Sequence, residues 1–167
     1  MSFKDVSEYP FVEVFEENWE KIRDEYVRVQ TKMMAQTETN LYNQGWDAFS
    51  IFDFPYGREV PFAGMCRFTR DLIGEHVPSH GHAGFSRLAG GTVLEPHEGY
   101  QGDFLRMQLG LIIPEGDVAL RSTDEVRGWE EGKAFIFDDR LEHEAWNRTN
   151  DDRVVLLLDF VPEDDEF

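Results

Sequence analysis

Residues 85–160 read FSRLAGGTVLEPHEGYQGDFLRMQLGLIIPEGDVALRSTDEVRGWEEGKAFIFDDRLEHEAWNRTNDDRVVLLLDF. Short apolar or alternating runs within this stretch, such as GTVLEPH, FLRMQLGLIIP and RVVLLLDF, are each ended by Gly, Pro, Asn or Asp. Several short strands separated by turn residues are typical of an all-β sandwich or barrel, not of alternating strands and helices. The stretch therefore predicts a mainly β core over residues 83–160.

The chain before this core has a helical pattern. In residues 11–36 apolar side chains recur about every 3.6 positions between Glu, Lys and Arg, which predicts one amphipathic helix. A second, shorter helix is expected around residues 63–74. With 167 residues the chain has the length of one domain, so we expect a single domain over residues 1–167. Residues 1–82 would form a helical and loop part that packs outside the β core.

Composition excludes several classes of partner. The formal net charge is −18, from 16 basic and 34 acidic residues, which argues against binding to the phosphates of nucleic acids. No apolar run approaches the 18 or so residues that a membrane span needs, so no membrane partner is expected. The lone Cys66 and the start MSFKDVSEYP, which lacks the pattern of a secretion signal, predict a cytoplasmic protein.

Two arginines in the predicted strands are candidates for carboxylate binding. Alternation places Arg106 and Gln108 on one face of their strand and the apolar Leu105 and Met107 on the other. Arg153 follows the turn NRTNDD, so we expect its strand to form a hairpin with HEAWN and to bring Arg153 near the first residue of that run, His143. A guanidinium offers a planar fork that suits one carboxylate of a dicarboxylic acid.

The alternative for Arg153 is a structural salt bridge. Its candidate partners are Asp151, Asp152 and Asp159.

Five histidines occur, and two of them lie in the β-rich part of the chain. His97 follows the run GTVLEP and His143 begins the run HEAWN, so two strands of a barrel could bring the imidazoles together. Two imidazoles suit the Fe(II) sites of oxygenases, where a carboxylate commonly completes the ligand set. Gly99 stands where that carboxylate is expected, so the residues alone leave the third ligand open among Glu95, Glu98 and Asp103.

The motifs of residues 85–160 resemble those of the aspartyl/asparaginyl β-hydroxylase family of 2-oxoglutarate oxygenases. The resemblance rests on PHEG, RMxLGLxxP, WEEGK, FDD and HEAWN, followed by an Arg ten residues after the His. The earlier EENWEKIRDE is similar to the helix that precedes this domain in that family. The resemblance implies a double-stranded β-helix (a jelly-roll or cupin-like barrel) and a dioxygenase that uses Fe(II), 2-oxoglutarate and O₂ to hydroxylate a C–H bond, releasing succinate and CO₂.

The resemblance also implies roles for individual residues. His97 and His143 would bind iron, with water in place of a carboxylate beside Gly99. Asp139 would hold that water. The cosubstrate would be bound by four further residues, namely Ser86, Leu88, Arg106 and Arg153. Gln108 stands where the family usually has His, and its amide can donate a hydrogen bond but cannot be cationic.

Two other functions are compatible with parts of the pattern. A cupin-type metal enzyme is suggested by Gly74 with His80-Gly81-His82, but the Glu expected four or five residues after the second His is replaced by Ser86 and Arg87. A non-catalytic ligand-binding β-helix is suggested by Gln108.

For the substrate we expect a small molecule, a free or derivatised amino acid, because the chain is short and lacks an accessory peptide-binding domain. His80 and His82 are candidates for contact with a carboxylate of that substrate. The aromatic-rich segment 44–64 has two interpretations, a wall of the pocket or part of the core.

Overall fold

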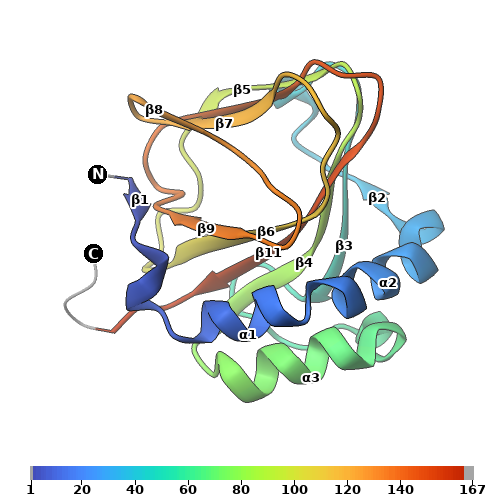
Figure 1. Cartoon of the computed structure of the whole chain (residues 1–167), viewed down its shortest axis with the longest axis vertical. Coiled ribbons are helices and arrows are strands. Elements are labelled where there is room, and N and C mark those ends of the chain that lie inside the picture. Colours follow the sequence, from blue (N-terminus) through green and yellow to red (C-terminus); the bar gives the residue numbers. More distant parts are fainter. Residues whose placement is uncertain (1, 164–167) are drawn as a thin grey trace.

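Two antiparallel sheets face each other in the computed structural model, which describes residues 2–163 (Figure 1). The larger sheet contains, in spatial order, β1 (Phe3–Lys4), β9 (Ala134–Phe137), β6 (Leu105–Ile112), β11 (Arg153–Phe160), β4 (His80–Leu88), β3 (Trp46–Phe52) and β2 (Met34–Ala35). The smaller sheet contains β5 (Thr92–His97), β10 (His143–Asn147), β7 (Val118–Ser122) and β8 (Glu125–Gly128). This arrangement confirms the predicted mainly β, double-stranded β-helix class.

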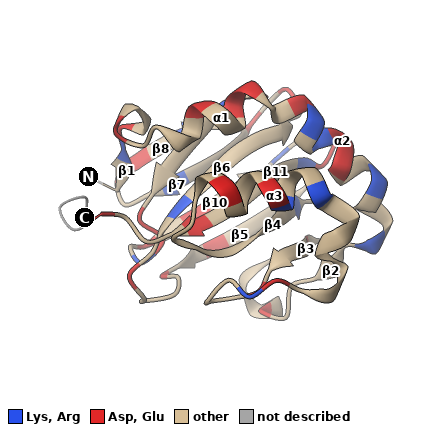
Figure 2. Ribbon diagram, turned by 90° about the horizontal axis from the view of Figure 1, so that it is seen from below, with Lys and Arg blue, Asp and Glu red and all other residues tan. Residues whose placement is uncertain are grey.

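Three α-helices cover the outside of the larger sheet (Figure 1). They are α1 (Phe11–Glu17), α2 (Trp19–Val29) and α3 (Arg67–His76). Short 3₁₀ turns cover Val6–Glu8, Gln30–Lys32, Thr39–Leu41 and Pro61–Cys66. Figure 2 shows acidic residues along all three helices and basic residues along α2 and α3. The other faces of the helices are apolar and pack on the sheet. No helix within residues 2–163 has the length and apolar character that a membrane span requires.

Strand alternation separates an outer core from an inner one. On β11, Leu156 and Leu158 point to the helices and join the larger apolar cluster, whereas Val155 joins the cluster between the two sheets. The same period of two on β6 sends Leu105, Met107, Leu109 and Leu111 to the helices. Arg106 and Gln108 therefore face the space between the sheets, as their alternation predicts.

The helix predicted over residues 11–36 is wrong in its extent. The structure has two helices that meet at Asn18, and the second ends at Val29. The Asn18 side chain donates a hydrogen bond to the Val14 carbonyl (2.8 Å) and its backbone leaves the helical region. A short polar side chain that bonds to nearby backbone competes with the helix, and apolar periodicity alone does not reveal this break.

Two expectations about strands also need correction. Residues 1–82 contribute β1, β2, β3 and the start of β4 to the larger sheet, so they are not only helix and loop. The hairpin expected between HEAWN and RVVLLLD does not form, because β10 pairs with β5 and β7 while β11 pairs with β4 and β6. The turn at residues 148–152 instead carries the chain from the smaller sheet to the larger one. Arg153 therefore approaches His143 from the opposite sheet.

Candidate active site

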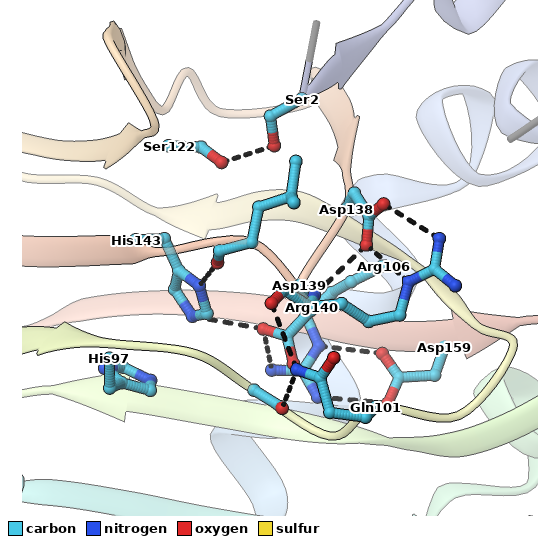
Figure 3. Close-up of polar contacts among 12 residues, drawn as sticks. Ser2, His97, Gln101, Arg106, Ser122, Asp138, Asp139, Arg140, His143 and Asp159 are labelled. Carbon is cyan, nitrogen blue, oxygen red and sulfur yellow. Dashed lines mark hydrogen bonds and ion pairs between the residues drawn. The ribbon is translucent and has the colours of Figure 1, made fainter.

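The two histidines expected to bind metal lie side by side at one end of the smaller sheet. His97 is the last residue of β5 and His143 the first of β10, and the two are direct partners in the antiparallel ladder. Their ring centroids lie 4.4 Å apart. The close-up in Figure 3 shows both side chains. His143 is buried and His97 is half-buried, so one face of the pair remains open.

A backbone carbonyl two residues earlier orients each imidazole. His97 Nδ1 lies 2.7 Å from the Glu95 carbonyl oxygen, and His143 Nδ1 lies 2.8 Å from the Leu141 carbonyl oxygen. A carbonyl only accepts hydrogen bonds, so each Nδ1 carries the proton and each neutral ring keeps a lone pair on Nε2. Burial lowers the pKa of His97, which favours the neutral form that binds metal. Both rings are thus prepared to act as ligands through Nε2.

A carboxylate lies directly against this pair. Asp139 Oδ1 is 3.1 Å from His143 Nε2, which brings two hydrogen-bond acceptors together and calls for a proton or a metal cation beside them. Gly99 makes this position possible, because a Cβ on residue 99 would lie 1.8 Å from Asp139 Oδ2. Among residues 2–163 no three His, Cys, Asp or Glu side chains form a metal-binding group. The two imidazoles, each with Nε2 free for a ligand, and the adjacent Asp139 carboxylate are nevertheless donors that could hold a metal cation.

Arg106 fixes that carboxylate in place. Its Nε and Nη2 donate to the two oxygens of Asp159 (2.7 and 3.0 Å), and its Nη1 donates to Asp139 Oδ1 at 3.1 Å (Figure 3). Burial alone would raise the pKa of Asp139, but the Arg106 guanidinium outweighs burial and holds that pKa well below its usual range. Asp139 is thus a permanent anion at neutral pH. Arg106 was expected to bind the cosubstrate, but two protein carboxylates already balance its charge.

Arg153 is a buried cation of the site that has no carboxylate partner among residues 2–163. Its side chain is 3% exposed and lines an inner cavity between the sheets together with His97 and His143. Nη2 donates to the Ser86 hydroxyl and carbonyl oxygens (3.1 and 3.3 Å), while Nε has no hydrogen-bond partner within the described residues. The guanidinium lies over the Trp129 ring, 4.6 Å from its centroid. Burial without a carboxylate lowers the pKa of Arg153 to about 9, so the site favours an added anion.

Two neutral side chains complete this set of donors. The Ser86 oxygen accepts from Arg153 and from Trp46 Nε1 (3.3 Å), which leaves the hydroxyl proton free to donate. Trp129 Nε1 donates to Gln108 Oε1 at 2.8 Å, and an indole N–H can only donate, so the Gln108 amide nitrogen is the group left for other partners. The inner cavity, whose wall includes the predicted Leu88, thus presents hydrogen-bond donors around a buried cation.

A larger outer cavity of about 720 Å³ opens beyond the histidines. Segment 44–64 forms part of the cavity wall and part of the core, so both interpretations of it apply. Trp46 and Phe54 line this cavity, and Ile51 packs in the core. His82 also lines it. His80 does not, because its ring packs on Phe52 with centroids 4.0 Å apart.

Two residues of the site escaped sequence reasoning. Asp159 was considered as a partner of Arg153, but the β6–β11 register pairs it with Arg106. Strand alternation places it on the inner face and so offered a partial signal. Trp129 was noted only as part of the motif WEEGK. A buried indole needs an acceptor for its N–H, yet the sequence does not say which one.

Comparison with known proteins identifies the family. A family model described as "Aspartyl/Asparaginyl beta-hydroxylase" matches residues 16–162. The chain belongs to this family. Within the aspartyl/asparaginyl β-hydroxylases it is 33% identical over 168 residues to a Rhizobium tropici protein named "Ornithine lipid ester-linked acyl 2-hydroxylase", covering 94% of this chain and 59% of that protein. It is 34% identical over 157 residues to the human "Aspartyl/asparaginyl beta-hydroxylase", covering 89% of this chain.

These relatives are longer than the chain, which spans 20% of the human protein's length. Among solved structures, a Pseudomonas putida prolyl-4-hydroxylase superposes with a TM-score of 0.57 at 15% identity, covering 89% of this chain and 88% of that one. This likeness supports the fold. The family assignment made from the motifs is confirmed by the family model that matches residues 16–162.

Proposed function

We propose that the protein is an Fe(II)- and 2-oxoglutarate-dependent dioxygenase that hydroxylates a C–H bond of a small amino-acid-type substrate. The observation that carries this proposal is the inner cavity, where a buried guanidinium without a counter-charge lies in the same pocket as two imidazoles that keep Nε2 for a ligand. A dianion that binds metal at one end and a guanidinium at the other fits both requirements. 2-Oxoglutarate has that chemistry.

Some residues of the site would bind the metal and its water, and others would bind the cosubstrate. His97 and His143 would hold Fe(II), and Asp139 would hold a water molecule beside it in the space that Gly99 leaves. When bound, the iron would use O₂ and 2-oxoglutarate to supply the oxidising chemistry, with succinate, CO₂ and a hydroxylated product as the result. Arg153 would bind the distal carboxylate of 2-oxoglutarate.

Other side chains orient these groups. The Ser86 hydroxyl and the Gln108 amide would donate to the cosubstrate, and Leu88 would form an apolar wall beside it. Arg106 would act mainly by holding Asp139, because Asp159 and Asp139 already occupy its guanidinium. A site built on strands of two facing sheets keeps these groups rigid and screens them from water.

The substrate is assigned by the size of the outer cavity and the family. The two relatives named above carry names that refer to a lipid acyl chain and to aspartyl or asparaginyl residues, so the family does not fix one substrate. A cavity of about 720 Å³ is within the usual range for small-molecule sites. A free or derivatised amino acid is our proposal, and a cytoplasmic location stays a prediction.

Turnover of 2-oxoglutarate tests this function. The purified protein is supplied with Fe(II), ascorbate, 2-oxoglutarate and O₂, and succinate is measured with and without a panel of amino acids. We expect succinate release that depends on iron and is lost in His143→Ala, which should not bind the metal. His80→Ala, whose ring lies outside both cavities, is the matched control and should retain activity.

Failure would take a recognisable form. If iron and 2-oxoglutarate bind but no substrate on the panel, and no protein extract, stimulates succinate release, the non-catalytic binding protein becomes the better description. If the two ligands do not bind at all, the proposed site itself is wrong.

A further inference from the structure

The outer cavity, where the substrate would lie, is lined by more acidic than basic side chains. The Asp, Glu, Lys and Arg side chains that line it are Glu38, Glu98, Arg106 and Asp139. Arg106 is the cation of this set, and Asp139 and Asp159 hold it in hydrogen-bonded ion pairs. Fe(II) and the 2-oxoglutarate dianion carry equal and opposite charges, so loading the site leaves this balance unchanged. The substrate therefore meets a negative cavity with no uncompensated cation among its described lining residues.

Two carboxylates of this lining are available to a ligand. Glu38 lies just before the 3₁₀ turn Thr39–Leu41, and Glu98 follows the end of β5, so they reach the cavity from separate segments. Both are exposed, and neither forms an ion pair or a side-chain hydrogen bond with any residue in 2–163. Glu38 also acts electrostatically on both His97 and Arg106, which places its charge within reach of the site's interior.

Aromatic side chains line the same cavity. Phe54 is 54% exposed and Tyr100 is 37% exposed, and their rings meet edge to face with centroids 5.2 Å apart. The His82 ring contacts Phe54 in the same way, at 5.9 Å. Exposed aromatic faces next to carboxylates form the usual surroundings of a bound ammonium or guanidinium group.

His82 adds an acceptor to this wall. Its Nδ1 lies 3.1 Å from the Phe52 carbonyl oxygen, to which it donates, so Nε2 keeps a lone pair. Burial lowers the pKa of His82, so the ring is neutral at pH 7. A neutral imidazole with a free lone pair accepts a hydrogen bond from an N–H donor. His82 would then accept from an N–H group of the substrate, whereas the sequence suggested that it contacts a substrate carboxylate.

We propose that the outer cavity binds its substrate through a cationic group, an ammonium or a guanidinium, and disfavours a substrate that presents a carboxylate there. This inference rests on the proposed function, because it names the substrate class for the same site. It assigns Glu38 and Glu98 as residues that determine specificity by charge.

Binding of three matched probes tests the charge preference without turnover. N-acetyl-L-lysine methylamide, N-acetyl-L-norleucine methylamide and N-acetyl-L-glutamate methylamide carry a positive, a neutral and a negative side chain. Each is titrated calorimetrically, in the absence of O₂, into protein loaded with Mn(II) and 2-oxoglutarate. We expect the lysine probe to bind at least about fivefold more tightly than the norleucine probe, and the glutamate probe to bind least.

Charge-neutralising variants locate the effect. Glu38→Gln and Glu98→Gln keep the shape of each side chain and should each reduce the preference for lysine over norleucine, with the double variant removing most of it. Glu13→Gln is the matched control, because Glu13 is an exposed carboxylate on α1 that lines neither cavity. It changes the net charge equally and should leave the preference unchanged.

The outcomes separate this inference from the proposed function. Loss of Mn(II) or 2-oxoglutarate binding by the unaltered protein would defeat the proposed function before any probe is added. If the loaded protein forms but does not prefer the lysine probe, or binds the glutamate probe best, the charge assignment is overturned. A preference that survives in the double variant also overturns it.

Discussion

Gly99 acts through the side chain that it lacks. Its backbone N–H donates to the Asp139 carbonyl oxygen (2.8 Å), and the Asp139 carboxylate fills the space that a Cβ would take. We expect Gly99→Ala to displace that carboxylate from His143 and to weaken metal binding by about 10–100-fold, the usual effect of losing a group that supports metal ligands. Binding of Mn(II), followed by calorimetry, measures this.

Gly74→Ala is the matched control, because a Cβ at this exposed helical position meets nothing within 4 Å. It should leave metal affinity unchanged and raise the free energy of unfolding by about 0.5–1 kcal/mol. Equal metal affinities in the two variants would contradict the role given to Gly99.

Trp129 links the two donors that would hold the cosubstrate. It donates to Gln108 and supports the Arg153 guanidinium with its ring face. Trp129→Phe keeps a ring but removes the N–H that donates to Gln108 Oε1. The Gln108 amide can then rotate, and its nitrogen is no longer held in position to donate to the cosubstrate. We expect the dissociation constant for 2-oxoglutarate to rise about 3–10-fold while Mn(II) affinity stays the same.

Trp146→Phe controls for the loss of an indole hydrogen bond, since Trp146 Nε1 donates to the exposed Asp117 carboxylate. This variant should bind 2-oxoglutarate normally in the same titration. An identical loss of affinity in both variants would show that Trp129 has no specific role.

At the level of elements, α2 stabilises the start of α3. The N-terminus of α3 has no side-chain cap of its own, and the buried Glu25 of α2 takes that role. Its carboxylate accepts from the Thr69 N–H (2.7 Å), the Thr69 hydroxyl (2.6 Å) and the Phe68 N–H (3.1 Å).

Removing this carboxylate should loosen the contact between the two helices. Glu25→Ala leaves buried donors without a partner, so we expect the free energy of unfolding in urea to fall by about 2–3 kcal/mol. Glu20→Ala, at an exposed position of the same helix, should change it by less than about 0.5 kcal/mol. A similar loss in both variants would mean that Glu25 contributes no more than an ordinary surface residue.

Elements were predictable from sequence where local chemistry decides them. Gly, Pro and Asp turns separate the strands of residues 85–160, and alternation correctly placed Arg106 and Gln108 on the inner face. The pairing of β10 was not predictable, because a turn such as NRTNDD can close a hairpin or pass between sheets, and only the global packing selects one. The break at Asn18 was hidden by continuous apolar periodicity on both sides.

The candidate site was predictable to a different extent. The motifs in the sequence indicated His97, His143 and Arg153 as site residues. In the fold, the strands bring all three to one cavity. The contacts among Arg106, Asp139 and Asp159 depend on strand register, which alternation alone does not give. Charge balance in the site is therefore a property of the folded molecule.

For the molecule as a whole, the ionisation and chemical reactivity of the Cys66 thiol measure whether the core is folded. It is fully buried, and burial, with a smaller contribution from Glu25, raises its pKa to about 12. The thiol has a pKa near 8.5 in the unfolded chain, so it ionises there at a lower pH than in the folded protein. The stabilisation that the buried neutral thiol gives is complete below pH 8.5 and is lost as the pH rises towards the pKa of the folded state. Urea unfolding should lose about 2 kcal/mol between pH 8.5 and pH 10 from this group.

Cys66→Ala removes this titration and serves as the reference for all other groups, so its free energy of unfolding should fall less over the same pH range. A thiol reagent at pH 8 should modify the native protein only as fast as it unfolds. Rapid modification of the folded protein, or parallel pH profiles for the two proteins, would contradict the burial of this thiol.

The central claim is that one bound dianion connects the histidine pair to Arg153. A crystal grown without O₂ and soaked with Fe(II) and 2-oxoglutarate tests it directly. We predict metal density between His97 Nε2 and His143 Nε2, with the 2-oxoglutarate bound to that metal and its far carboxylate at Arg153. Metal at any other place, or a cosubstrate that leaves Arg153 without a partner, would contradict the account.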